Sequence, residues 1–400
     1  MKAGTESGNA AARLSSETAR RLEREGLKTA EGGREGVRAF TVTVIDLHAT
    51  DVRRLYGNRR LSGGAEPDDR LRKIAARAAA RALYVLGRDF GQVVVVTDEN
   101  GRPAVAGVSG APRPSPGEGR RRTAAAAAMR ETRLTMEKEG VRAVLGADPE
   151  FVLRAGDGKL VPASRYLPPG GAAGCDSVVR RGIRHWVLAE LRPAPAEEPA
   201  ELAASIRRLL AAAARRIGTG ADPAWLAGAW PVPGLPLGGH IHFSGVALTG
   251  ERLRALDNAV ALPLRLLEPL GAAARRPRYG ALGDFRRQPH GFEYRTPPSW
   301  LVSRRLAAGV LALAKIAAEH SGELAAGRPL DDDRLRDAFY GEGEEEMLRS
   351  AFGRYFETIQ RTAGYRKYAR EADYVFRAVA DRRQWDEHAD IRAKWGLLTE

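Results

Sequence analysis

The spacing of hydrophobic positions in the N-terminal part of the chain predicts a small α/β unit. Helical spacing over the Ala-rich residues 70–86, followed by Gly87, predicts a helix that ends at this glycine. The turn-forming sequence Asp98-Glu99-Asn100-Gly101 separates two β-branched runs and favours a hairpin. Alternating or β-branched apolar positions predict strands over residues 40–47, 92–97 and 103–108.

Helical periodicity dominates the second half of the chain. Pro199 occupies a favoured first helical position, Gly218 follows the last turn of the same helix, and Ser303 is a typical N-cap of a later one. Beyond residue 331 the pattern is helical and charged. The periodicity predicts helices over residues 123–139, 199–217, 251–267 and 303–320.

Changes in composition divide the chain into five parts. The first is polar and contains several glycines, which predicts a flexible arm with a transient helix near residues 15–25. The stretch APRPSPGEGRRR predicts a linker. The expected parts are the arm at 1–38, a small accessory α/β unit at 39–110, the linker at 111–122, a larger domain at 123–330 and a helical extension at 331–400.

Four short stretches in the larger domain each place ionisable residues two positions apart. Residues i and i+2 of a β-strand point to the same face of the sheet, so each pair would share one surface. Burying these charges is costly without a compensating ligand, which indicates a site for a metal ion and phosphate. The stretches are Asp148-Pro149-Glu150, Glu190-Leu191-Arg192, His240-Ile241-His242 and Glu293-Tyr294-Arg295.

The first stretch lies in GADPEF, residues 146–151. Neighbouring carboxylates at Asp148 and Glu150 repel each other, so at least one pKa should rise unless a cation lies between them. Pro149 cannot donate a ladder hydrogen bond, which predicts a sheet edge or the start of a strand. A turn with two solvated acids is the alternative. Taken alone, Glu190 and Arg192 of VLAELRP favour an internal ion pair or a solvated strand face.

The stretch LGGHIHFSG, residues 237–245, is the most specific. Gly238 and Gly239 permit close approach of backbone or ligand. His240 and His242 share a face with Ser244, and two histidines so placed can bind one metal ion, or one metal and one phosphate.

The segment 283–299, GDFRRQPHGFEYRTPPS, supplies the last group. Glu293 is a candidate metal ligand, and Arg295 and Arg286 can hold an oxyanion with their planar donor forks. His290 follows a proline and is expected in a loop. Carboxylate-rich sites suit Mg²⁺ or Mn²⁺ shared with substrate phosphates, and added arginines favour phosphoryl transfer from a nucleotide. The sequence lacks the GxxxxGK[ST] pattern of a P-loop.

Charge and cysteine content narrow the expected partners and location. The 64 Lys and Arg exceed the 50 Asp and Glu by a net charge of +14, but the arginines are scattered and no basic tract has interleaved aromatics. Nucleic acid is therefore not the expected partner. The single cysteine, Cys175, excludes a disulfide framework and fits a reducing cytoplasm. Without a run of 18 apolar residues or a signal sequence, we expect no membrane span.

Four motifs, GADPEF, AELRPAPA, GGHIHFSG and GFEYRTPPS, resemble in this order the phage-type carboxylate–amine ligases, type 2, of the glutamine-synthetase superfamily. The resemblance covers residues 145–320. It implies an α+β fold in which a curved antiparallel sheet carries helices on its outer face. It also implies ATP-dependent formation of an amide through an acyl phosphate, on an amino acid, a peptide or a cell-surface carboxylate, with 123–330 as the catalytic domain.

The resemblance also implies roles for individual residues. His240 would ligate the metal nearest the γ-phosphate, His242 and Ser244 would lie on the nucleotide side, and Arg192 would contact phosphate or a substrate carboxylate. Arg286 and Arg295 would hold the transferred phosphate. The implied metal ligands are Glu150, Glu190, His240, Glu293 and, less securely, Asp148.

Two other classes remain as alternatives. A zinc hydrolase could use His240, His242 and a glutamate with an open coordination position. A basic nucleic-acid-binding protein would explain the net charge but would leave the four polar stretches without a role. The arginines and the surplus of carboxylates favour the ligase.

Overall fold

The chain divides into two compact units, Met1–Thr135 and Met136–Glu400. The predicted linker at 111–122, the predicted helix at 123–139 and most of the predicted arm lie outside the described residues. The computed structural model describes residues 14–30, 38–55, 69–110, 141–218, 220 and 222–398.

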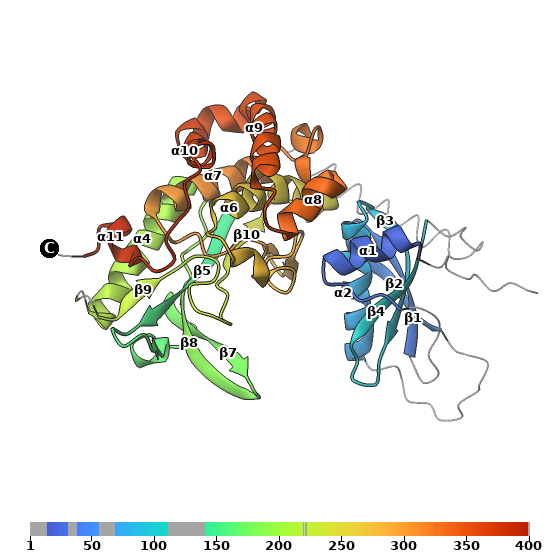
Figure 1. The fold of residues 1–400 in the computed structure, drawn as a ribbon, viewed down its shortest axis with the longest axis horizontal. Coiled ribbons are helices and arrows are strands. Elements are labelled where there is room, and N and C mark those ends of the chain that lie inside the picture. The colour runs from blue at the N-terminus through green and yellow to red at the C-terminus, as the bar shows by residue number, and fades with distance from the viewer. Residues whose placement is uncertain are drawn as a thin grey trace, which may run out of the picture. The chain divides into compact units, whose positions relative to one another are not determined.

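The first unit is built on a four-stranded antiparallel sheet with the order β2-β1-β3-β4 (Figure 1). Buried side chains of the strands and of α2 form one apolar core. The predicted strand at 40–47, the helix at 70–86 and the hairpin are confirmed. The elements are α1 (Ser16–Arg24), β1 (Arg38–Ile45), β2 (His48–Leu55), α2 (Asp69–Val85), β3 (Phe90–Thr97) and β4 (Pro103–Ser109).

The second unit contains a curled antiparallel sheet with the order β11-β12-β10-β5-β8-β7, to which the short strands β6 and β9 add by pairing with β5. Strand β5 is the long central element and pairs with four others. The strands are β5 (Val144–Arg154), β6 (Leu160–Val161), β7 (Ala173–Arg180), β8 (Ile183–Leu191), β9 (Ala224–Leu226), β10 (Gly239–Ser244), β11 (Phe285–Gln288) and β12 (Gly291–Tyr294).

The helices of the second unit confirm the helical predictions for its described part. The predicted helix at 251–267 forms with one π turn, Asp257–Ala261, just before Pro263, which has no N–H to donate to the preceding turn. None of the described helices is long and apolar enough to cross a membrane. The helices are α4 (Pro199–Ile217), α5 (Gly250–Leu256), α6 (Leu262–Leu267), α7 (Arg304–Glu319), α8 (Asp333–Tyr340), α9 (Glu345–Arg361), α10 (Ala363–Ala380) and α11 (Ile391–Trp395).

One face of the larger sheet is apolar and lies toward the helices (Figure 1). Ile241, Phe243 and Phe292 are fully buried on this face, and the two phenylalanine rings stack with centroids 5.0 Å apart. The Tyr294 hydroxyl is also buried and donates to Asp257 Oδ1 of the π turn over 2.7 Å. Because side chains alternate along a strand, these buried residues direct their neighbours to the opposite face. The α+β prediction, with an antiparallel sheet and helices on one side, is confirmed.

The prediction drawn from Pro149 was wrong, since this proline lies inside the central strand. The N–H of Glu150 donates to the Gly238 carbonyl on the β10 side, so the backbone of Pro149 faces the other side of β5. There the pairing with β8 begins only at Glu150. Pro149 thus occupies the position where β5 has no ladder hydrogen bond to donate, which is why a central strand tolerates it.

Gly309 fixes how closely α7 approaches α10, which suggests a stability test. A Cβ at this position would lie 2.4 Å from Val375 Cγ2 and 2.8 Å from the Glu371 carbonyl oxygen. We expect Gly309→Ala to lower the free energy of unfolding by about 1–3 kcal/mol, because overpacking outweighs the better helix propensity of alanine. Chemical denaturation measures the change.

Gly353→Ala in α9 is the matched control, because no atom lies within 4 Å of its added Cβ. This variant should keep or raise the free energy of unfolding. Equal effects of the two substitutions would contradict the proposed close approach.

A candidate active site on the polar face of the sheet

Strand pairing brings all four polar stretches onto one face of the larger sheet. Residues directly opposite each other in an antiparallel ladder share a face, so their side chains become neighbours. The turn with two solvated acids is not what forms at residues 148–150, since both acids lie in β5 and Glu150 is buried. The opposed pairs are His240 with Asp148, His242 with Glu293, Arg286 with Glu293, and Glu190 with Glu150.

Glu293 lies at the centre of this face and is almost completely buried, with 1% of its side chain exposed. Its Oε2 atom lies 3.1 Å from Arg286 Nη1, and its Oε1 atom lies 3.0 Å from Arg295 Nε. Gln288 Nε2 donates to Oε2 over 3.2 Å, and His240 Nδ1 lies 3.4 Å from Oε1. Basic groups from β10, from β11 and from the residue that follows β12 therefore converge on one carboxylate.

Asp148 lies between the two histidines. Its Oδ1 atom is 3.2 Å from His240 Nδ1, and its Oδ2 atom is 3.1 Å from His242 Nε2. Burial alone would raise the pKa of Asp148, but the two imidazoles outweigh it and hold that pKa well below its usual range. For His240, burial alone would lower the pKa, and the charges of Asp148 and Glu150 raise it above the ordinary histidine value.

The acid pair Glu150 and Glu190 occupies the next position along β5. Glu150 accepts a hydrogen bond from the Gly238 N–H over 2.7 Å. Burial raises the pKa of Glu150, although the charge of His240 and the Gly238 N–H act in the opposite direction. Glu190 forms an ion pair with Arg192, which also donates to the Gly171 carbonyl over 3.1 Å. The internal ion pair considered for this stretch is therefore present, next to the other acids.

Gly238 and Gly239, where β10 begins, leave space for the His240 ring and for the backbone of Pro298. A Cβ at Gly238 would lie 2.4 Å from His240 Nε2, and one at Gly239 would lie 2.2 Å from the Pro298 carbonyl oxygen. The Pro298 oxygen belongs to the backbone, so only glycine fits at position 239, whereas a side chain at position 238 would have to displace the His240 ring. The predicted need for close approach at these positions is confirmed.

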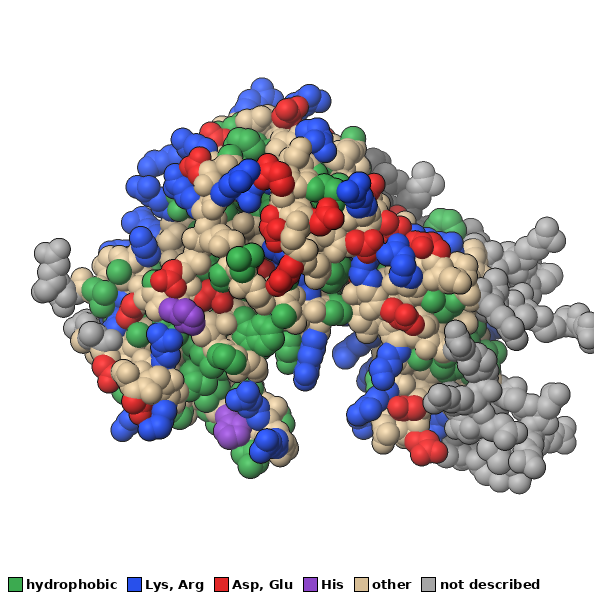
Figure 2. All heavy atoms as spheres, in the orientation of Figure 1, with side chains coloured by type: hydrophobic (Ala, Val, Ile, Leu, Met, Phe, Trp, Pro, Cys, Tyr) green, Lys and Arg blue, Asp and Glu red, His purple; other side chains and the backbone are tan. Residues whose placement is uncertain are grey.

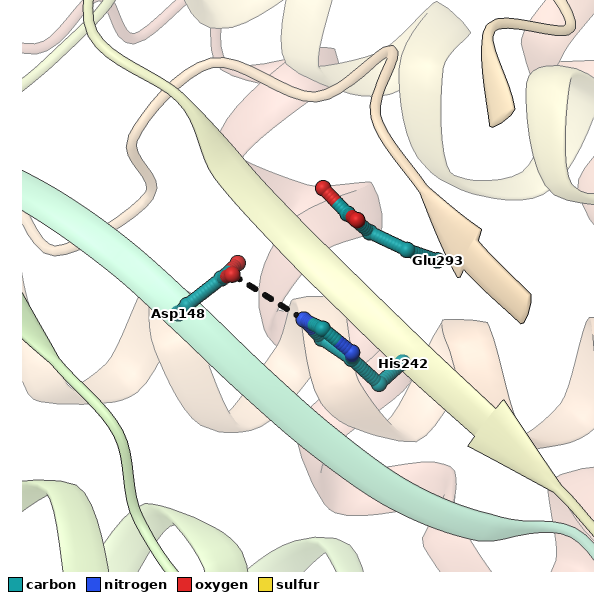
Figure 3. Close-up of side chains that lie close together, drawn as sticks. All are labelled: Asp148, His242 and Glu293. Carbon is teal, nitrogen blue, oxygen red and sulfur yellow. Dashed lines mark ion pairs between the residues drawn. The ribbon is translucent and has the colours of Figure 1, made fainter. Parts of the chain in front are cut away.

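Asp148, His242 and Glu293 have the chemistry and the spacing of a metal-binding group. One ligand atom from each lies within 4.8 Å of the others, and Figure 3 shows the three side chains meeting from β5, β10 and β12. Asp148 Oδ1 and Glu293 Oε1 are buried and accept no hydrogen bond from a described residue, although ion-pair partners lie nearby. Two carboxylates with unsatisfied oxygens beside an imidazole fit a divalent cation.

The family resemblance implies His240 as a metal ligand and His242 on the nucleotide side, and this assignment stays a prediction. The possible metal-binding group contains His242, and His240 Nδ1 also lies 3.2 Å from Asp148 Oδ1 and 3.4 Å from Glu293 Oε1. Both histidines share the face, but strand register decides which ring nitrogen meets which acid. Ser244 lies two residues beyond His242, opposite Val144 at the start of β5.

Several residues near the site were given no role by the sequence analysis. Gln288 reaches Glu293 from the end of β11, and its position two residues after Arg286 was an available signal. His290, correctly expected in a loop, lies with its ring 5.9 Å from that of His242. Ser299 Oγ donates to the Glu150 carbonyl over 2.5 Å, and Trp300 Nε1 donates to the Gly239 carbonyl over 2.9 Å. The last two contacts are long-range and had no sequence signal.

The fold and the polar face define an α+β protein with acids, imidazoles and guanidiniums on one face of an antiparallel sheet. Residues 145–397 match the sequence model of the family described as phage phiEco32-like COOH.NH2 ligase-type 2. The match spans more than half of the chain, so the chain belongs to this family of carboxylate–amine ligases. The predicted resemblance is confirmed.

Two solved structures are similar to the chain at low identity. Apo GmaS without ligand is 15% identical, with coverage of 91% of this chain and 95% of that chain and a TM-score of 0.34. A novel glutamine synthase homolog is 16% identical, with coverage of 74% and 80% and a TM-score of 0.27. No curated protein matches the chain.

The contact between Asp148 and His240 predicts how the metal-free protein responds to pH. In EDTA, the His240 pKa should lie above the ordinary histidine value, and Asp148→Asn should lower it because the hydrogen bond to an ionised partner is lost. The folded state favours the protonated ring. The stabilisation from His240 is therefore full below the ordinary histidine pKa and is lost as pH rises through the folded-state pKa.

Imidazole NMR chemical shifts report the titration, and denaturation at several pH values reports the stability. Asp157→Asn is the control, because this acid is exposed and pairs with Lys159 outside the site. A His240 pKa that stays unchanged in Asp148→Asn would contradict the ion pair.

Proposed function

We propose that this protein is an ATP- and Mg²⁺-dependent ligase that joins a carboxylate to an amine through an acyl phosphate. One observation carries the proposal: the buried carboxylate of Glu293 belongs to the possible metal-binding group and also contacts two arginines, within the segment that matches the ligase family. Metal ligands beside guanidinium forks are what phosphoryl transfer requires, because its catalysis depends on positioning and on neutralising charge.

Asp148, His242 and Glu293 would hold a first divalent cation, with Glu150 and Glu190 available for a second. The oxygen-rich donor set favours Mg²⁺, with Mn²⁺ as the alternative. When bound, the metal would neutralise the phosphates of ATP and screen the repulsion between these acids. This assignment gives Asp148 a larger role, and His240 a smaller one, than the family resemblance implied.

Arg286 and Arg295 would hold the phosphoryl group during transfer. Glu293 contacts both guanidiniums, and this leaves their other N–H groups free to face the substrate. The substrate carboxylate would attack the γ-phosphorus, forming the acyl phosphate and releasing ADP. The amine would then attack the acyl carbon, forming the C–N bond as the C–O bond to phosphate breaks.

The remaining candidates would bind substrate around this centre. Ser244 lies beyond His242 on β10, and we assign it to the nucleotide side. We assign Arg192, which forms an ion pair with Glu190 and donates to the Gly171 carbonyl, to contact with a phosphate or the carboxylate substrate. The carboxylate is an amino acid, a peptide or a cell-surface group, and the partner is an amine.

Nucleotide and metal should stabilise the folded protein together. We expect ATP with Mg²⁺ to raise the melting temperature more than ATP in EDTA, because ligands that bind only the native state stabilise it by mass action. Glu293→Gln should remove this metal-dependent increment. Thermal unfolding measures it, and an ADP-release assay over amino acids, peptides and amines measures turnover. Stabilisation by Zn²⁺ alone, without any effect of nucleotide, would favour a zinc hydrolase instead.

Arg286 and Arg287 are adjacent on β11 and provide a matched pair of substitutions. Arg286 contacts Glu293 on the polar face, whereas Arg287 lies on the other face, with its guanidinium 5.9 Å from the Phe285 ring. We expect Arg286→Ala to lower kcat/KM by about 10²-fold, the usual effect of losing one charge-stabilising group. Arg287→Ala should leave it nearly unchanged, and equal losses in steady-state ADP release would contradict the assignment of Arg286.

A further inference from the structure

A second basic site lies in the helical layer, away from the strands of the candidate active site. A groove of about 580 Å³ is lined by residues of α4, α7 and α10. Figure 2 shows Lys and Arg side chains gathered over the part of the second unit where Figure 1 draws α10 and α4. The charged and aromatic residues of the groove are Arg304, Arg305, Arg370, Arg377, Glu371 and Tyr374.

The positive charge of this groove is largely uncompensated. Four arginines face one glutamate, which leaves three positive charges in excess. Among the described residues, no acid forms an ion pair with Arg304, Arg305 or Arg370. Arg377 Nε donates only to a backbone carbonyl, that of Asp373, over 3.3 Å. Elsewhere in this unit, buried arginines such as Arg276 and Arg392 do have acidic partners.

The walls of the groove are held by packing and by polar contacts. Glu198, at the N-cap position of α4, accepts hydrogen bonds from Lys367 (2.5 Å) and Tyr368 (3.1 Å) at the start of α10. Gly309 of α7 allows the close contact with α10 described above. The arginines therefore project from backbones whose mutual positions are fixed, which reduces the ordering that a ligand would have to impose.

The groove has the size and the surface for a small phosphorylated ligand. Its volume falls within the range of about 300–1,000 Å³ typical of small-molecule pockets. Guanidinium forks match phosphate oxygens and bind them in pairs. The Tyr374 ring and a set of alanines offer an apolar surface beside the charges, suited to a flat ring. The alanines are Ala200, Ala203, Ala204 and Ala308.

We propose that this groove binds a small anion with a di- or triphosphate group, either a nucleotide or an inorganic polyphosphate. The site is separate from the candidate active site, because none of its lining residues belongs to a strand of the sheet. The two sites are close in sequence at one point. Ser299 and Trp300 donate hydrogen bonds to β5 and β10, and Arg304 of the groove follows a few residues later. The inference does not depend on the proposed catalytic function.

Isothermal titration calorimetry with inorganic triphosphate and with ADP, in EDTA, tests this proposal. EDTA removes divalent cations, so binding that depends on metal at the sheet is suppressed. We expect one saturable site, and the double variant Arg304→Ala/Arg370→Ala should weaken binding by at least about tenfold. Tighter binding of ADP would identify a nucleotide site, and equal binding would identify a site for the phosphate chain itself.

Arg215→Ala/Arg216→Ala is the matched control, since it removes the same charge from the last turn of α4, about 17 Å along the helix from the groove. Equal weakening in both double variants would show attraction to the net charge alone and would overturn the proposal, as would the absence of saturable binding. Ala204→Glu provides a second variant that places an acid in the groove wall. Binding should persist in Glu293→Gln, and its loss there would assign the anion to the sheet instead.

Discussion

The burial of Glu293 is the constraint on which the candidate site depends. A carboxylate with 1% of its side chain exposed loses hydration that the protein must replace. Arg286 of β11, His240 of β10 and Arg295, the residue that follows β12, supply the compensating charge. Only the strand order β11-β12-β10 brings these three groups to one carboxylate. The charges around Glu293 are therefore compensated only when the strands of the sheet pair in this order and register.

Alternation along the strands separates stability from chemistry in the larger unit. One face carries Ile241, Phe243 and Phe292 against the helices, and the opposite face carries the ionisable groups. The apolar face offsets the cost of collecting acids on the polar face, and a bound metal would offset it further. The helical layer adds a basic groove of its own. Positive charge is thus concentrated in two places whose surroundings differ.

Prediction from sequence was most successful where a signal is local. Helix caps such as Ser303 and the i, i+2 spacing of His240 and His242 depend on nearby residues, and both were confirmed. Strand β2, with the sequence HATDVRRL, was missed because its side chains are mostly polar and none is fully buried. The position of Pro149 was predicted wrongly because a proline fits inside β5 only where no hydrogen bond to β8 is needed. The pairing with β8 begins at Glu150, and no local sequence pattern shows where it begins.

The sequence by itself determined the residue types of the site, their pairing on single strands and the family to which the chain belongs. Only the tertiary structure decided that Asp148, His242 and Glu293, from three different strands, lie close enough to form a possible metal-binding group. It also decided that Arg192 is engaged by Glu190, and that arginines far apart in sequence line one groove. The physical reason is that the spacing of residues along the chain decides which face of its own strand or helix a side chain occupies. Strand register and the packing between elements decide which side chains from other elements lie beside it.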